Sequence, residues 1–111
     1  EPARRMSSPP PSPWLCVLRL ANPKDAATPD ESTLEIIGAH FDYLSRLRDQ
    51  GHVLFAGRTL DAEPMGLIVY LAPDEQSARD RADADPAVKQ GVMRAEVRPF
   101  RVALEGFTRS A

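Results

Sequence analysis

The chain contains 111 residues, of which 42% are hydrophobic and 27% are charged, and this balance is typical of one soluble globular domain. No apolar run approaches the roughly 20 residues that a membrane-spanning helix requires, so we expect no membrane association. The net charge of −2 provides no positive field for phosphate backbones, which favours small molecules over nucleic acid as partners.

The N-terminal residues are rich in proline and show no apolar periodicity. Residues 1–13 hold five of the eleven prolines, and they cannot bury enough surface to offset the cost of ordering the chain. We therefore predict a disordered proline-rich tail over residues 1–13, one folded domain over residues 14–105 and a C-terminal tail over residues 106–111.

The first predicted element is a strand over Trp14–Leu20 (WLCVLRL), a β-favouring run that ends at the turn signal Asn22-Pro23. This run contains Cys16, the only cysteine, so the chain cannot form an internal disulfide. A cysteine among apolar neighbours is usually a small buried hydrophobe rather than a reactive thiolate. These features fit a reducing compartment, and we expect a cytoplasmic protein.

A long helix is predicted next. Thr28 followed by Pro29 and Glu31 has the form of a capping box, which indicates a helix start. The helix should continue to about Gln50, because Gly51 follows as the expected left-handed C-terminal residue. Its apolar side chains recur at intervals of three and four residues: Leu34, Ile37, Phe41, Leu44 and Leu47.

Two further strands are predicted over His52–Arg58 (HVLFAGR) and Gly66–Ala72 (GLIVYLA), joined by a polar segment that suits a loose hairpin. Asp74 then caps a second helix, which ends at Asp85-Pro86. The last predicted strand covers Val92–Leu104. Its apolar alternation changes phase, so we expect a bulge or bend near Arg98-Pro99.

The resulting βαββαβ order predicts a ferredoxin-like α+β fold, with two helices on one face of a four-stranded antiparallel sheet. The first three strands are apolar on both of their faces. A sheet with one solvated face should instead alternate apolar with polar residues, so the second face is expected to pack against another subunit. We predict a homodimer through this face.

His40 lies within the apolar arc of the long helix, between Leu44 and Leu47 when ~100° per residue is applied, and should face the sheet. A histidine in such a position needs a hydrogen-bond partner. It is either a core residue satisfied by a backbone carbonyl or a functional residue, and the two readings remain open at this point.

Asp85 is expected to cap a short helix that begins at Pro86 and continues through Lys89. In a βαββαβ domain the two helices lie side by side, so a residue midway along the first can reach the end of the second. If Asp85 accepts a hydrogen bond from His40, the tautomer and orientation of the imidazole are set for proton transfer. Such a pair would be a catalytic dyad.

Other candidate sites have weaker support. Arg58 and Arg98 are either surface charges or, at a pocket mouth, contacts for an anion. His52 opens a strand and is expected at the surface. The histidines and the cysteine lack metal-ligand spacing and no glycine-rich phosphate loop is present, so we expect no metal and no nucleotide or other cofactor. The strand GLIVYLA supplies only Tyr70 as an aromatic residue, too few for an RNA-binding sheet.

The sequence resembles the YciI-like (YCII-related) family in two runs, AHFDYLSRLRDQGHVLFAGR and ADADPAVKQGVMRAEVRPF. The resemblance also includes the first strand and the segment that joins the two runs, so it covers about residues 14–104. Its markers are H-x-x-x-L-x-x-L before a glycine, L-x-A-G, A-D-P before a glycine, and V-x-P-F. The resemblance implies a subunit of a dimeric α+β barrel, with a pocket whose histidine and aspartate match His40 and Asp85. Arg58 departs from the family pattern, which has proline there, and Ala87 stands where an aromatic residue is common.

The leading hypothesis is a small-molecule enzyme of lyase or isomerase type. In it His40 moves a proton, Asp85 orients the ring and Arg58 holds an anionic group. The resemblance implies dehydrochlorinase-like proton transfer, because a characterised relative is a dehydrochlorinase and related barrels include muconolactone isomerase. The alternative is a non-catalytic dimeric module that binds a small ligand or a regulatory protein, since some relatives are linked with sigma factors. A purely structural role predicts that the His40 and Asp85 side chains do not meet.

Overall fold

A computed structural model describes residues 10–106, and within that range the chain follows the predicted βαββαβ order. Among these residues, no helix is both long and apolar enough to cross a membrane. In chain order the elements are β2 (Ser12–Leu20), the 3-10 turn η1 (Pro23–Ala26), α1 (Glu31–Asp49), β3 (Val53–Arg58), β4 (Met65–Ala72), α2 (Glu75–Asp83), α3 (Pro86–Lys89) and β5 (Met93–Pro99).

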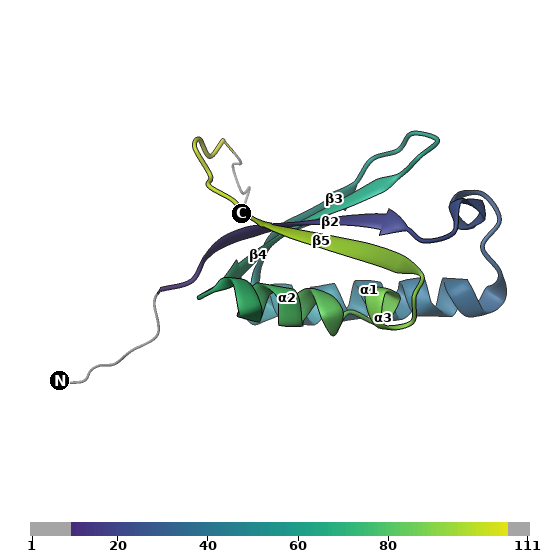
Figure 1. Cartoon of the computed structure of the whole chain (residues 1–111), viewed down its shortest axis with the longest axis horizontal. Coiled ribbons are helices and arrows are strands. Elements are labelled where there is room, and N and C mark those ends of the chain that lie inside the picture. The colour runs from purple at the N-terminus through teal and green to yellow at the C-terminus, as the bar shows by residue number, and fades with distance from the viewer. Residues whose placement is uncertain (1–9, 107–111) are drawn as a thin grey trace.

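The strands form one antiparallel sheet in the order β3-β4-β2-β5, which is the ferredoxin-like arrangement. The helices α1, α2 and α3 lie in a second layer against one face of this sheet (Figure 1). The fold class predicted from the sequence is therefore confirmed. Each helical connection returns the chain to the same face, which brings α1 beside the α2–α3 segment.

The start of α1 differs from the prediction. Asp30 is the N-cap, and its Oδ1 accepts a hydrogen bond of 2.8 Å from the backbone N–H of Thr33. The hydroxyl of Thr28 instead donates to the carbonyl of Lys24, which ties it to the preceding turn η1. Thr28 therefore does not cap the helix, because its side chain already satisfies the turn. The predicted end is confirmed, since Gln50 is the C-cap and Gly51 has a φ of 83°.

The outer limits of the sheet also differ from the prediction. β2 begins at Ser12, which pairs with Ala72, so residues 12 and 13 belong to the sheet and not to the predicted tail. The remainder of that tail up to residue 9, and residues 107–111 of the predicted C-terminal tail, lie outside the described residues.

The last strand is shorter than expected, because β5 ends at Pro99 and not at Leu104. The strand ends there for two reasons. Pro99 has no N–H to donate to the ladder. Its partner in the register is Trp14, which lies close to the start of β2, so little of the neighbouring strand remains to pair with. The predicted irregularity near Arg98-Pro99 is absent from the β2–β5 register, and the register shift lies in β3 between Val53 and Phe55.

The main core lies between the helices and one face of the sheet. Side chains that alternate along β2, β4 and β5 point to this face and contact the inner sides of the helices. The buried cluster contains Cys16, Leu18, Leu44, Leu47, Val53, Ile68, Tyr70, Ala72, Ala78, Ala82 and Val97. This core sets the distance between α1 and the sheet, and therefore the depth of the space in which His40 lies.

The other face of the sheet, which we call the open face, is also apolar. It carries Leu15, Val17, Phe55, Leu67, Val69 and Leu71. No helix of the described chain covers it (Figure 1). Charged side chains of β5 border this apolar surface: Arg94, Glu96 and Arg98.

Candidate functional site

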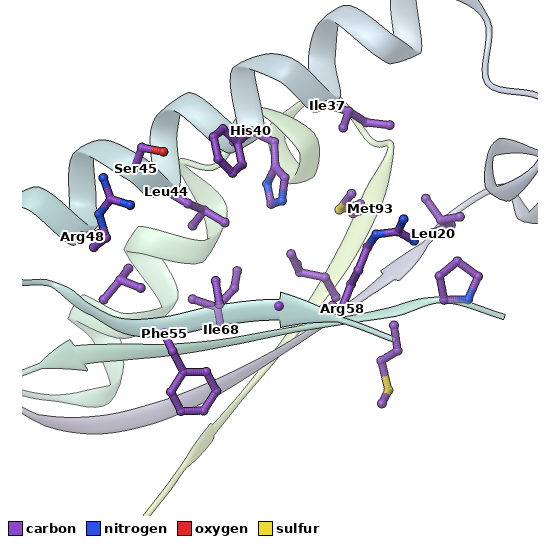
Figure 2. A pocket seen from close by; sticks show the side chains of 18 of the residues that line it. Leu20, Ile37, His40, Leu44, Ser45, Arg48, Phe55, Arg58, Ile68 and Met93 are labelled. Atoms are coloured by element: carbon purple, nitrogen blue, oxygen red, sulfur yellow. The ribbon is translucent and has the colours of Figure 1, made fainter. Parts of the chain in front are cut away.

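His40 lies near the middle of α1 and projects into the space between that helix and the sheet (Figure 2). Only 15% of its side chain is exposed. The helix places it there because the apolar positions that hold α1 against the sheet, including the buried Leu44 and Leu47, lie on the same side. The predicted inward direction of this histidine is confirmed.

Asp85 lies at the junction of α2 and α3 and is completely buried. It is the N-cap of α3, as the sequence predicts, and its Oδ1 accepts a hydrogen bond of 2.9 Å from the backbone N–H of Ala87. Pro86 occupies the first position of α3, where its missing N–H leaves no donor unsatisfied. A buried carboxylate is costly without partners, so the second partner of Asp85 matters for stability.

That second partner is His40. Its Nδ1 lies 2.7 Å from Oδ2 of Asp85 and 2.9 Å from Oδ1. Because a carboxylate only accepts hydrogen bonds, Nδ1 carries the proton and donates it to this contact. In neutral His40 the lone pair is then on Nε2, and no group among residues 10–106 forms a hydrogen bond with Nε2. The structure thus brings together the two residues singled out in the sequence, and a purely structural reading in which they do not meet is wrong.

The charge of the buried Asp85 carboxylate influences the pKa values of three other side chains, those of Tyr43, Cys16 and Tyr70. The hydroxyl of Tyr43 donates to the carbonyl of Arg81 over 2.6 Å, and burial followed by the charge of Asp85 raises the pKa of Tyr43. Burial, and then the charge of Asp85, raises the pKa of Cys16 to about 12. Cys16 is therefore a neutral thiol, as expected from its apolar neighbours.

Tyr70 was not identified as a site residue from the sequence. Its hydroxyl is buried and has no hydrogen-bond partner among the described residues. Burial, with smaller effects from Cys16 and Asp85, raises its pKa, so the hydroxyl stays protonated. Strand alternation could have placed Tyr70 on the helix-facing side, because Ile68 and Ala72 share that face.

A pocket of about 770 Å³ opens between α1 and the sheet beside His40 (Figure 2). Its walls are mainly apolar, and the side chains nearest the histidine in the chain are Ile37, Phe41 and Leu44. Charged residues also line it: Asp25, Arg48 and Arg58. A volume of this size is typical of sites for small organic molecules.

Arg58 is the last residue of β3 and enters the pocket from the sheet side (Figure 2). By contrast, Arg98 is exposed and forms an ion pair of 2.7 Å with Glu96, which agrees with a plain surface charge. His52 is half-buried rather than fully exposed and does not line the pocket. Within residues 10–106, no group of three or more His, Cys, Asp or Glu side chains is arranged to hold a metal ion.

Comparisons with known proteins agree with this fold. The family model of the YCII-related domain matches residues 15–101. A solved structure, that of 5-chloro-2-hydroxyhydroquinone dehydrochlorinase from Burkholderia phenoliruptrix AC1100 in complex with 2,5-dihydroxybenzoquinone, is similar with a TM-score of 0.60 and 18% sequence identity. The similarity covers 79% of this chain and 93% of that chain. No curated protein matches this chain.

Proposed function

Because the chain belongs to the YCII-related domain family, we propose that it is a small-molecule enzyme of lyase or isomerase type in which His40 transfers a proton. The observation that carries the proposal is the contact of 2.7 Å between Nδ1 of His40 and the fully buried Oδ2 of Asp85. This contact leaves Nε2 as a base beside a pocket of about 770 Å³. Asp85 is the orienting residue of the pair.

The proposed chemistry begins with neutral His40. Nε2 accepts a proton from an acidified C–H group of the substrate, and the electron pair of that bond stays on the substrate. The imidazolium that forms is stabilised by the carboxylate of Asp85, which already accepts from Nδ1. In an isomerase reaction the proton returns to a different atom of the substrate. In an elimination, the electron pair forms a new double bond while a leaving group such as halide departs with its bonding electrons.

The structural neighbour supports an elimination among the reactions to be tested. Its name identifies a dehydrochlorinase, and its structure contains a dihydroxybenzoquinone. Planar cyclic compounds of similar size suit the apolar walls of the pocket. Arg58 lines the same pocket and is our candidate substrate-binding residue.

We also propose that the protein forms a homodimer through the open face. On this face Phe55 is exposed and Leu15, Val17, Leu67 and Leu71 are partly exposed, whereas Val69 is buried, and no helix of the described chain lies over them (Figure 1). An apolar sheet face of this kind is usually buried by a partner, and a two-fold copy is the simplest one. The buried thiol of Cys16 fits the reducing cytoplasm, which is the location that we propose.

The test compares His40→Gln and Asp85→Asn with the wild-type chain on halogenated phenols, hydroxyquinones and lactones. Loss of the C–H signal in deuterated water, followed by NMR, reports proton abstraction even where no product accumulates. We expect both variants to lose turnover by a factor of roughly 10² or more, the usual contribution of a positioned general base. His52→Gln is the matched control, because His52 does not line the pocket.

Two outcomes would count against this function. If a compound is turned over normally by both variants, His40 and Asp85 are not the catalytic pair. If His40→Gln instead weakens ligand binding, and neither turnover nor C–H exchange is found with the wild-type chain, the protein is the non-catalytic binding module.

A further inference from the structure

The pocket contains a cation that the proton-transfer mechanism does not use. Arg58 lines the pocket, yet its guanidinium forms no ion pair or hydrogen bond with any residue between 10 and 106. The other arginine that lines the pocket, Arg48, binds the carboxylate of its neighbour Asp49 at 3.0 Å. Arg58 therefore has its donors available for a ligand.

The register of the sheet places Arg58 on the same side as His40. Arg58 pairs with Gly66, and Ala56 pairs with Ile68, whose side chain belongs to the core under the helices. Figure 2 shows the side chains of Arg58 and His40 entering the same space from opposite walls, one from the sheet and the other from α1. A ligand in this space can thus contact both.

Small residues keep the sheet side of the pocket open beside Arg58. Gly66 is its direct cross-strand partner and carries no side chain; a Cβ at that position would lie only 3.3 Å from the Cβ of Leu18, so Leu18 packs closely against this glycine. Gly57 and Ala56 also line the pocket. At these three positions no side chain is larger than a methyl group, so the sheet itself does not shield the guanidinium from a flat ligand.

The chemistry of the lining selects the kind of ligand. Three residues that carry or can carry positive charge line the pocket, namely His40, Arg48 and Arg58, against one acid, Asp25. A guanidinium presents parallel N–H donors that match the two oxygens of a carboxylate, and this match is lost with a neutral amide. The apolar walls, which include Leu20, Ile37, Phe41 and Met93, suit a ring or an unsaturated chain.

We propose that Arg58 determines the specificity of the pocket by selecting ring compounds that carry a carboxylate, which it binds while the ring lies against Nε2 of His40. This rests on the proposed function for the role of His40. The preference for a carboxylate is a property of binding and can be measured without any reaction.

The test measures binding of benzoate and of benzamide, which have nearly the same shape but differ in charge. Calorimetry and NMR titration of the full chain give both affinities. We expect the wild-type chain to prefer benzoate by about tenfold or more, as for a charge-assisted bidentate contact. Arg58→Gln should remove the preference, and Arg58→Lys should retain part of it, because lysine keeps the charge but not the fork.

Arg79→Gln is the matched control, because Arg79 is exposed on α2, away from the open face, and does not line the pocket. This variant should keep the wild-type preference. The proposal is overturned if wild type binds the two compounds equally or binds neither, or if Arg58→Gln keeps the preference.

The outcome is separable from that of the proposed function. His40→Gln should still prefer benzoate while it loses turnover. If Arg58 controls the preference but no variant changes turnover, the proposed function fails and the carboxylate site stands. If turnover depends on His40 but the preference does not depend on Arg58, only the carboxylate site is wrong.

Discussion

Replacement of Asp85 probes the site most directly, because this one side chain performs two tasks. It caps α3 through the N–H of Ala87 and accepts from Nδ1 of His40. Asp85→Ala removes both interactions. Asp85→Asn keeps an oxygen that can accept from Ala87, but its amide N–H₂ cannot accept from Nδ1.

The magnitude follows from these two contacts. Loss of an N-cap costs about 1 kcal/mol. Loss of a hydrogen bond to a charged group costs about 1.5–3 kcal/mol. We therefore expect Asp85→Ala to lower the free energy of unfolding by about 2.5–4 kcal/mol. Asp85→Asn should cost less, because the cap is kept.

The assay is urea denaturation followed by circular dichroism, repeated at several protein concentrations because dimer formation would couple to stability. His40→Gln and its double variant with Asp85→Ala complete a thermodynamic cycle. Residues in direct contact usually show a coupling energy of about 0.5–3 kcal/mol. The same samples allow the proton on the His40 ring to be located by ¹⁵N NMR.

The expected ¹⁵N spectra distinguish the wild-type chain from the Asp85→Asn variant. Wild-type His40 should carry its proton on Nδ1 when neutral, and Asp85→Asn should favour the Nε2–H tautomer, which has no lone pair toward the pocket. A coupling energy near zero, or a wild-type ring protonated on Nε2, would refute the buried pair as the source of stability and orientation.

Two more predictions concern the open face and the buried thiol. Leu67→Glu, on the open face, should convert the proposed dimer to a monomer in analytical ultracentrifugation. The control Leu34→Glu, on the exposed side of α1, should leave the dimer intact. A monomeric wild-type chain would contradict the proposed dimer. Because the pKa of Cys16 is raised from 9.0 to about 12, its contribution to stability is complete below pH 9 and is lost as the pH rises toward 12. The unfolding free energy should therefore fall more steeply above pH 9 in wild type than in Cys16→Ala, and equal slopes would show that the thiol is not buried as described.

Much of the fold followed from local patterns. The apolar spacing of α1, the left-handed Gly51 and the cap at Asp74 depend on nearby residues, so they could be predicted without the sheet. The start of α1 could not, because Thr28 and Asp30 are both good caps and only the turn at Lys24 decides between them. The end of β5 was also missed, since it depends on where its partner β2 begins.

For the site, the inward direction of His40 and the capping role of Asp85 could both be predicted from nearby residues, because helical periodicity and capping are local properties. The contact between the two side chains could not be established in this way, since 45 positions separate them and the contact needs α1 packed beside α3. The same packing buried Tyr70 near the carboxylate and opened the pocket between Arg58 and His40. These features depend on the distance between helix and sheet, which is set by the whole core and not by any single segment.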